Sequence, residues 1–241
     1  MLRTALFSLL LAPLALLANE AQIRKALEPK LGDGKIEGVQ PGPIPGLFEV
    51  RVRDSDGVQI LYTDAAGAHV ILGKIIETRT GRRLTDERLR KLNAIKFESL
   101  PLDLAVTVKR GNGKRVLAMF SDPYCPACRN FERALAEVDD ITIHVFMYPV
   151  IRPENAHHSK AVWCAPDRAK AWLELAAAPR PKVPEAGASC ANPVEKVLEV
   201  GHKLGVNSTP TLFFANGERL AGGLSAGDLK EMLDRTATAR R

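Results

Sequence analysis

Short apolar stretches alternate with polar residues between positions 47 and 80, and this period is typical of half-buried strands. Polar turns at 54–57 and 64–67 separate the stretches and indicate an antiparallel meander. The apolar strand positions are Phe48, Val50, Val52, Val58, Ile60, Tyr62, Val70 and Leu72.

A helix is predicted before this meander, over residues 20–31. Its apolar positions recur at helical spacing, and Gly32 ends it. Residues 19–80 are therefore expected to form a small unit of one helix and one sheet. So short a segment without a disulfide has a marginal core, which favours self-association.

A second helix is predicted over residues 85–98, within a linker that spans residues 81–103. Thr85 is a capping residue, acidic residues fill the first turn, and Pro101 ends the run. The basic residues of this region could form a nucleic-acid patch, but a solvated helix face is the favoured interpretation. These basic residues are Arg82, Arg83, Arg88, Arg90 and Lys91.

Strands and helices alternate from residue 104 onward, which indicates an α/β unit over residues 104–241. Strands are predicted at 104–109, 114–121 and 141–147, and residues 116–120 form the continuous apolar run of a buried strand. Between the last two strands, a Cys-Pro-Ala-Cys motif opens a helix with Phe131, Leu135 and Val138 on its apolar face. A Cys-x-x-Cys in this setting is typical of a redox dithiol.

The first 18 residues are predicted to be a secretory signal. Arg3 is the one charge before Glu20, and the apolar run at 5–18 contains Pro13 and is shorter than the roughly 20 residues of a membrane span. Cleavage is expected near Ala18; an uncleaved anchor is the alternative. An exported chain reaches a compartment where disulfides persist.

The composition narrows the function classes. The 241 residues are 46% hydrophobic and carry a net charge of +6, which excludes a disordered acidic chain. Aromatic residues make up 5%, so stacking of bases on an aromatic platform is disfavoured and no nucleic-acid partner is expected. The 4 cysteines are the informative feature.

Cys125 is expected at the start of a helix, where free N–H groups and the helix dipole favour a thiolate. Pro126 suits the first helical position. Cys128, one turn further, is predicted to be more buried, so Cys125 would attack and Cys128 would resolve. Half of a zinc site and a purely structural disulfide are the alternatives. No second pair of ligands has zinc spacing and a four-residue loop restrains little entropy, so no metal or cofactor is expected.

Further residues downstream complete the candidate site. Thr209-Pro210 precedes a predicted strand at 211–214, and on this stretch alone a cis bond facing the cysteines or a trans proline that starts an edge strand would fit equally. Together with the Cys-x-x-Cys motif and a final helix predicted over 226–235, the cis bond is favoured. Cys164 and Cys190 bracket a helix and a proline-rich stretch at 179–184, and a structural bridge is favoured over a second redox pair. The histidines are interpreted as surface or hydrogen-bonded polar residues.

Several stretches resemble the DsbC/DsbG family of periplasmic disulfide isomerases from Gram-negative bacteria, over nearly the whole chain. The stretches are Gly46-Leu47-Phe48-Glu49-Val50, Leu61-Tyr62-Thr63-Asp64, Leu72-Gly73, Phe120-Ser121-Asp122 with Cys125-Pro126-Ala127-Cys128, Val162-Trp163-Cys164-Ala165, Ala188-Ser189-Cys190 and Gly205-Val206-Asn207-Ser208-Thr209-Pro210-Thr211.

This resemblance implies a small cystatin-like α+β dimerisation domain, a linker helix and a thioredoxin-like catalytic domain with a helical insertion. It further implies a periplasmic V-shaped homodimer with an apolar cleft, reduced by a membrane electron donor of the DsbD type. By the same resemblance, Cys125 is the nucleophile and Cys128 the resolving thiol, Thr209 and Pro210 form the substrate-binding cis-proline loop, and Cys164 and Cys190 form the structural disulfide.

One departure concerns the dipeptide between the active cysteines, Pro126-Ala127, because family members more often carry an aromatic second residue. The dipeptide affects the reduction potential and hence the choice among isomerase, reductase and oxidase. The leading hypothesis is an isomerase for misfolded, disulfide-containing exported proteins. The alternatives are a DsbG-like reductase of sulfenylated cysteines and a redox-independent holdase chaperone.

Overall fold

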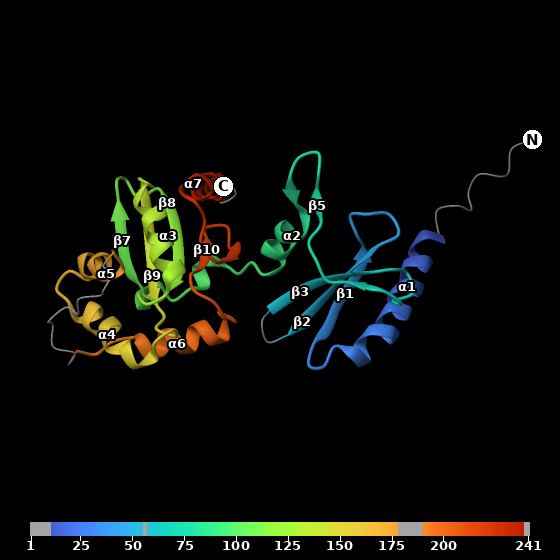
Figure 1. Cartoon of the computed structure of the whole chain (residues 1–241), viewed down its shortest axis with the longest axis horizontal. Helices are drawn as coiled ribbons and strands as arrows, with labels where there is room; N and C mark the ends of the chain where they lie inside the picture. Colours follow the sequence, from blue (N-terminus) through green and yellow to red (C-terminus); the bar gives the residue numbers. More distant parts are fainter. Residues whose placement is uncertain (1–10, 55–56, 178–189, 239–241) are drawn as a thin grey trace, which may run out of the picture. The chain divides into compact units, whose positions relative to one another are not determined.

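The structure, a computed structural model, describes residues 11–54, 57–177 and 190–238. The chain divides into two compact units, Met1–Asn93 and Ala94–Arg241 (Figure 1). Among the described residues, no helix is both long and apolar enough to cross a membrane. Each unit has its own core and is described by itself.

The first unit contains a four-stranded antiparallel sheet in the order β1-β2-β3-β4, so the predicted meander is confirmed. Its strands are β1 (Lys35–Pro41), β2 (Phe48–Asp54), β3 (Gly57–Thr63) and β4 (Val70–Ile71). Strand β1 escaped the sequence prediction because Gly38 interrupts its alternation, and the register shifts between Ile36 and Gly38. Val50 and Leu61 stand opposite each other and face the helix.

Helix α1 (Leu11–Leu27) covers this sheet with Ile23 and Leu27, which are buried against Val50 and Val52. The helix predicted over 20–31 is therefore its second half. The α-helix ends before a 3₁₀ turn at Glu28–Lys30, since Pro29 lacks a backbone donor and disfavours helical geometry in the residue before it. The first half of α1 overlaps the predicted signal, whose residues 1–10 lie outside the described residues.

Helix α2 (Leu84–Leu92) is shorter than the helix predicted over 85–98. It packs on the first unit, where the Thr85 hydroxyl bonds to the Tyr62 hydroxyl at 2.7 Å. The side chain of Asn93 accepts from Val58 N–H at 3.0 Å and so ties the end of the helix to β3. Phe97 already belongs to the core of the second unit. The predicted linker at 81–103 is thus divided between the two units. Its residues up to Asn93 belong to the first unit, and Phe97 is buried in the second.

Short elements surround α2 in the first unit and precede the sheet of the second. Two-residue strands β5 (Ile76–Glu77) and β6 (Arg82–Arg83) pair with each other. The 3₁₀ turns η2 (Phe97–Ser99) and η3 (Leu102–Leu104) follow α2. In the basic cluster, Arg82 pairs with Glu87 at 2.8 Å on the exposed side, as expected for a solvated helix face. Arg88 instead pairs with the buried Glu49 at 3.1 Å, so that prediction holds for only part of the cluster.

The second unit is built on a five-stranded sheet in the order β11-β10-β8-β9-β7. Its strands are β7 (Val106–Arg110), β8 (Arg115–Ser121), β9 (Ile141–Met147), β10 (Thr211–Phe214) and β11 (Arg219–Ala221). The predicted strands are confirmed. Although β7 and β8 are consecutive in sequence, β9 lies between them, parallel to β8 and antiparallel to β7.

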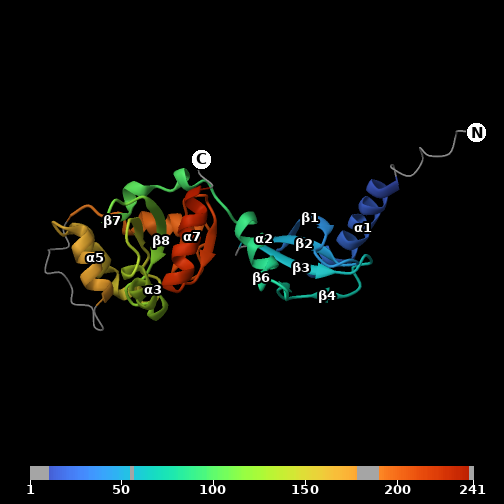
Figure 2. The same ribbon diagram turned by 90° about the horizontal axis from the view of Figure 1, so that it is seen from above.

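Helices cover both faces of this sheet (Figure 2). Leu117 and Met119 point to the core shared with α3, α5 and α7, whereas Ala118 and Phe120 point to the core that contains Val197 of α6. The helices are α3 (Pro126–Ala136), α4 (Ala156–Cys164), α5 (Arg168–Ala177), α6 (Val194–Lys203) and α7 (Ala226–Thr238). The predicted helices that begin at the Cys-x-x-Cys and near residues 170 and 226 are confirmed. The proline-rich stretch at 179–184 lies outside the described residues.

Candidate active site

Cys125 lies where strand β8 passes into helix α3. It is the N-cap residue of the helix, and Pro126 occupies its first turn. The Cys125 N–H donates to the carbonyl oxygen of Asp122 at 3.1 Å, and its own carbonyl accepts from Arg129 N–H at 3.1 Å. The thiol is therefore held at the positive end of the helix dipole, which stabilises a thiolate.

Asp122 supports this corner with its fully buried carboxylate. One carboxylate oxygen accepts from Tyr124 N–H and the other from Ile151 N–H, both at 2.7 Å. These bonds join the segment before Cys125 to the loop that follows β9. This role of Asp122 was not predicted, although an aspartate directly after a buried strand is a common turn signal.

Both cysteines are buried, with Cys125 6% and Cys128 2% exposed. Burial raises the pKa of the Cys128 thiol to about 12. Hydrogen bonds with the Ser121 side chain and the Asp122 backbone lower this pKa, but by less than burial raises it. At neutral pH Cys128 is therefore a protonated thiol. Both cysteines are free in the structure.

The Thr209-Pro210 peptide bond is cis and lies beside Cys125. The thiol of Cys125 donates to the carbonyl oxygen of Thr209 at 3.2 Å, across 84 positions of sequence. Strand β10 leaves this loop and pairs with β8, where Thr211 stands opposite Phe120. Sheet pairing thus brings the predicted loop to the predicted dithiol.

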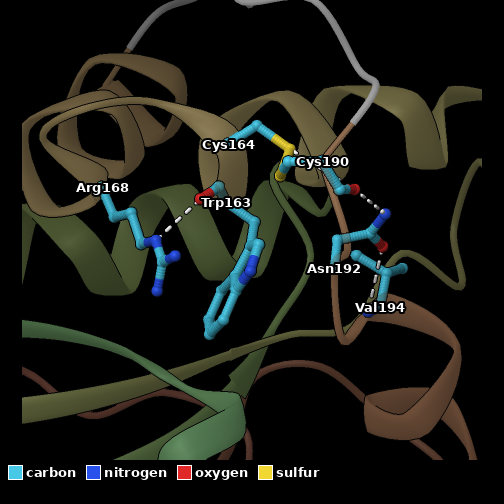
Figure 3. Close-up of a disulfide and its surroundings, with 6 residues drawn as sticks. All are labelled: Trp163, Cys164, Arg168, Cys190, Asn192 and Val194. Atoms are coloured by element: carbon cyan, nitrogen blue, oxygen red, sulfur yellow. Dashed lines mark hydrogen bonds between the residues drawn. A yellow bond between two sulfur atoms is a disulfide. The ribbon is translucent and has the colours of Figure 1, made fainter.

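A disulfide joins Cys164, the last residue of α4, to Cys190, with 5.8 Å between their Cα atoms (Figure 3). The guanidinium group of Arg168 lies 3.8 Å from the ring centre of Trp163, and its Nε donates to the Trp163 carbonyl at 2.7 Å. The disulfide therefore ties the helical insertion to the segment that leads into α6.

Two side-chain pairs near the cysteines were not predicted from the sequence. The hydroxyl of Tyr124 is hydrogen-bonded to Nδ1 of His158, whose pKa is lowered by burial and by the neighbouring His157. Glu132, one turn beyond Cys128, accepts a hydrogen bond from Trp172 Nε1 at 3.0 Å. Burial raises the pKa of Glu132 to about 7. Neither pair could be predicted from neighbouring residues in the sequence, because the partners come from different helices or loops.

No group of three or more His, Cys, Asp or Glu side chains that could hold a metal ion is found among the described residues.

Two family models match the chain. The Thioredoxin-like domain covers residues 102–237, and the Disulfide bond isomerase protein N-terminal domain covers residues 15–86. The first match confirms the thioredoxin-like architecture expected for the second unit. The second assigns the α+β unit at the N-terminus to the disulfide isomerases.

Curated relatives and a solved structure agree with these matches. The probable thiol:disulfide interchange protein DsbC of Bordetella avium is 39% identical over 219 residues, which are 90% of this chain and 75% of the relative. DsbC of Escherichia coli K12 is 28% identical, with 90% of this chain and 88% of the relative covered. A disulfide interchange protein from Neisseria gonorrhoeae matches with a TM-score of 0.53 and 38% identity, over 57% of this chain and 99% of that chain. The chain therefore belongs to the DsbC family of thiol:disulfide interchange proteins.

Proposed function

We propose that the protein is a periplasmic isomerase that reduces and reshuffles non-native disulfides in misfolded exported proteins. The asymmetry of its two cysteines is the observation that carries this proposal. Cys125 lies at a helix N-terminus, with its thiol 3.2 Å from the carbonyl oxygen of Thr209. Burial raises the pKa of Cys128 to about 12. Cys125 is therefore assigned the attack and Cys128 the slower resolution.

The first step is attack of the Cys125 thiolate on one sulfur of a client disulfide. A disulfide forms between Cys125 and the client, and the other client sulfur leaves as a thiolate. If another client thiolate then attacks the mixed disulfide, Cys125 is released and the client has been isomerised without net reduction. If Cys128 loses its proton and attacks Cys125 instead, the client leaves reduced and Cys125–Cys128 becomes a disulfide. The high pKa of Cys128 slows this second route and favours isomerisation.

The loop at Thr209-Pro210 is proposed to hold the client. The carbonyl oxygen of Thr209 lies beside Cys125 and is an acceptor for an extended client backbone. The disulfide between Cys164 and Cys190 is assigned a structural role, because it links the insertion and not the catalytic corner.

Reactivation of a scrambled protein with several disulfides tests the proposed function. The wild type should restore the activity of the substrate, and Cys125→Ala should not. Cys128→Ala should accumulate mixed disulfides with the client, because one route of release is lost. Equal reactivation by the wild type and Cys125→Ala would contradict the proposal, and full suppression of aggregation by Cys125→Ala would favour the holdase.

A homodimer is proposed through the edge strand β4. Val70, Ile71 and Leu72 are 44%, 50% and 81% exposed, and β4 ends the sheet with one edge unpaired among the described strands. A second copy would bury these side chains and pair the edge. In sedimentation, the wild type should form a dimer, and Leu72→Lys should shift it to the monomer. An unchanged dimer of the variant would contradict this interface.

Export through cleavage near Ala18 and reduction by a membrane electron donor of the DsbD type complete the proposal. The apolar start of the sequence and the disulfide at Cys164 both suit an oxidising compartment. Intact-mass measurement of the protein from the periplasm should give a chain shortened by the first 18 residues. A full-length chain would contradict cleavage there.

A further inference from the structure

An open pocket of about 570 Å³ lies between helices α3 and α5, next to the active-site dipeptide. Pro126, directly after Cys125, lines it, and Arg129 and Arg133 continue the wall along α3. Leu173 and Ala176 of α5 supply apolar surface. The lining of the pocket on α3 therefore begins at the residue after Cys125 and continues as far as Ala136.

The charge of the pocket is predominantly positive. Within the described part of the chain, neither Arg129 nor Arg133 forms an ion pair, and Arg133 bonds only to Asn130 Oδ1 of its own helix, at 3.1 Å. By contrast, Arg115 pairs with a carboxylate at 2.8 Å in the same unit. The guanidinium groups of Arg129 and Arg133 therefore remain available to an anion.

Glu132 is the one acidic residue among the described residues that line the pocket. Its carboxyl group is buried, accepts a hydrogen bond from Trp172 and interacts electrostatically with Arg110, so it pairs with neither Arg129 nor Arg133. Arg110 lines the same pocket, and its Nη1 donates to the carbonyl oxygen of Leu135. Guanidinium groups recognise carboxylates through charge-assisted hydrogen bonds, and the apolar wall suits an aliphatic neighbour.

We propose that this pocket, named here the Arg129–Arg133 pocket, is a specificity subsite that binds an acidic side chain of the client held at Cys125. The inference rests on the proposed function, since it requires a client polypeptide at the active site. The occupant is an extended acidic segment, selected by charge complementarity with the arginines.

Helix geometry limits where the acidic residue can stand. A rise of about 1.5 Å per residue places Arg129 about 6 Å and Arg133 about 12 Å beyond Cys125 along the helix axis. An extended peptide covers about 3.3 Å per residue. An acidic side chain two to four positions from the client cysteine therefore reaches the arginines, whereas one at the adjacent position does not.

Synthetic peptides with a single cysteine test this spacing. Each peptide carries thionitrobenzoate on its sulfur, and attack by the Cys125 thiolate forms the protein–peptide disulfide and releases thionitrobenzoate. Asp is compared with Asn at each of six positions on either side of the cysteine, and the same peptides react with dithiothreitol to correct for intrinsic reactivity. The corrected Asp-to-Asn rate ratio should reach about three- to tenfold at two to four positions on one side.

Three variants identify the source of the ratio. Arg129→Gln and Arg133→Gln should each bring the Asp-to-Asn ratio towards one. Lys230→Gln is the matched control, because Lys230 is an exposed cation on α7 of the same unit and does not line the pocket. It should retain the ratio of the wild type.

The inference would be overturned by the absence of an Asp preference in the wild type, or by an equal loss of the ratio in Lys230→Gln, which would indicate an effect of the general charge of the unit. A retained ratio in both arginine variants would also overturn it. Failure of the proposed function differs from all of these, because no peptide, with Asp or Asn, would then react in a Cys125-dependent way.

Discussion

Removal of the Asp122 carboxylate should destabilise the catalytic unit more than removal of any exposed turn aspartate. Its two oxygens accept the backbone N–H groups of Tyr124 and Ile151 at 2.7 Å, and the side chain is fully buried. In Asp122→Ala both donors lose their acceptor. A hydrogen bond to a charged group contributes about 1.5 to 3 kcal/mol, so the loss of both should cost the variant about 3 to 6 kcal/mol. Asp122→Asn keeps one acceptor oxygen and should lose about half as much.

Tryptophan fluorescence during urea unfolding measures this loss specifically. Both tryptophans of the sequence, Trp163 and Trp172, lie in the second unit, so their signal reports that unit alone. Asp167→Ala is the matched control, since the exposed Asp167 carboxylate accepts one N–H, from Lys170 at 3.0 Å. The control should lose no more than about 0.5 to 2 kcal/mol.

The outcome also has a functional readout. Because Asp122 joins the corner before Cys125 to the loop after β9, Asp122→Ala should slow the alkylation of Cys125 at a urea concentration where the unit is still folded. A loss of stability in Asp122→Ala no greater than in Asp167→Ala would refute the assignment of the carboxylate as the support of this corner. An unchanged rate of Cys125 alkylation would refute the effect of Asp122 on the Cys125 thiol.

Three further predictions concern stability. Burial raises the pKa of Glu132 to about 7 from an ordinary 4.5. The stability that the protonated carboxyl group contributes is therefore fully present below pH 4.5 and is lost as the pH rises through 7. Unfolding followed by tryptophan fluorescence should show the second unit about 2 to 3 kcal/mol less stable at pH 8 than at pH 5. Glu132→Gln should remove this difference. An equal difference in the variant would contradict the assignment of the pH dependence to Glu132. Replacement of both Cys164 and Cys190 by Ala opens a loop of 26 residues and should cost about 3 to 4 kcal/mol in the same assay, where an unchanged midpoint would contradict the role of the bridge. Tyr62→Phe removes the 2.7 Å bond to Thr85 and should cost the first unit about 1 kcal/mol, measured by far-UV circular dichroism. Gln59→Thr, at an exposed position of the same strand, is the control and should cost less.

Local patterns were sufficient for elements whose signals lie within a few residues. Helix α3 was predicted because Pro126 suits its first turn and Phe131 and Leu135 repeat at helical spacing. Strand β9 matches its predicted range, 141–147, because its flanks are polar and its apolar positions are continuous or alternating.

Other elements escaped prediction because their stability comes from partners distant in sequence. Strand β1 contains Gly38 and ends at Pro41, and it is held by pairing with β2. Helix α2 stops at Leu92, six residues before its predicted end, because Asn93 bonds back to β3 while Phe97 enters the other core. The helix and strand propensities of the residues do not encode these long-range contacts.

The sequence by itself determined the strand–helix–strand order of β8, α3 and β9 and the place of Cys125 at a helix start. These features follow from periodicity and capping, which act over one or two turns. The tertiary structure alone decided that the carbonyl of Thr209 lies 3.2 Å from the Cys125 thiol, and that burial raises the pKa of Cys128 to about 12. Both depend on desolvation and on sheet pairing between β8 and β10, and these arise only when segments 84 residues apart pack together.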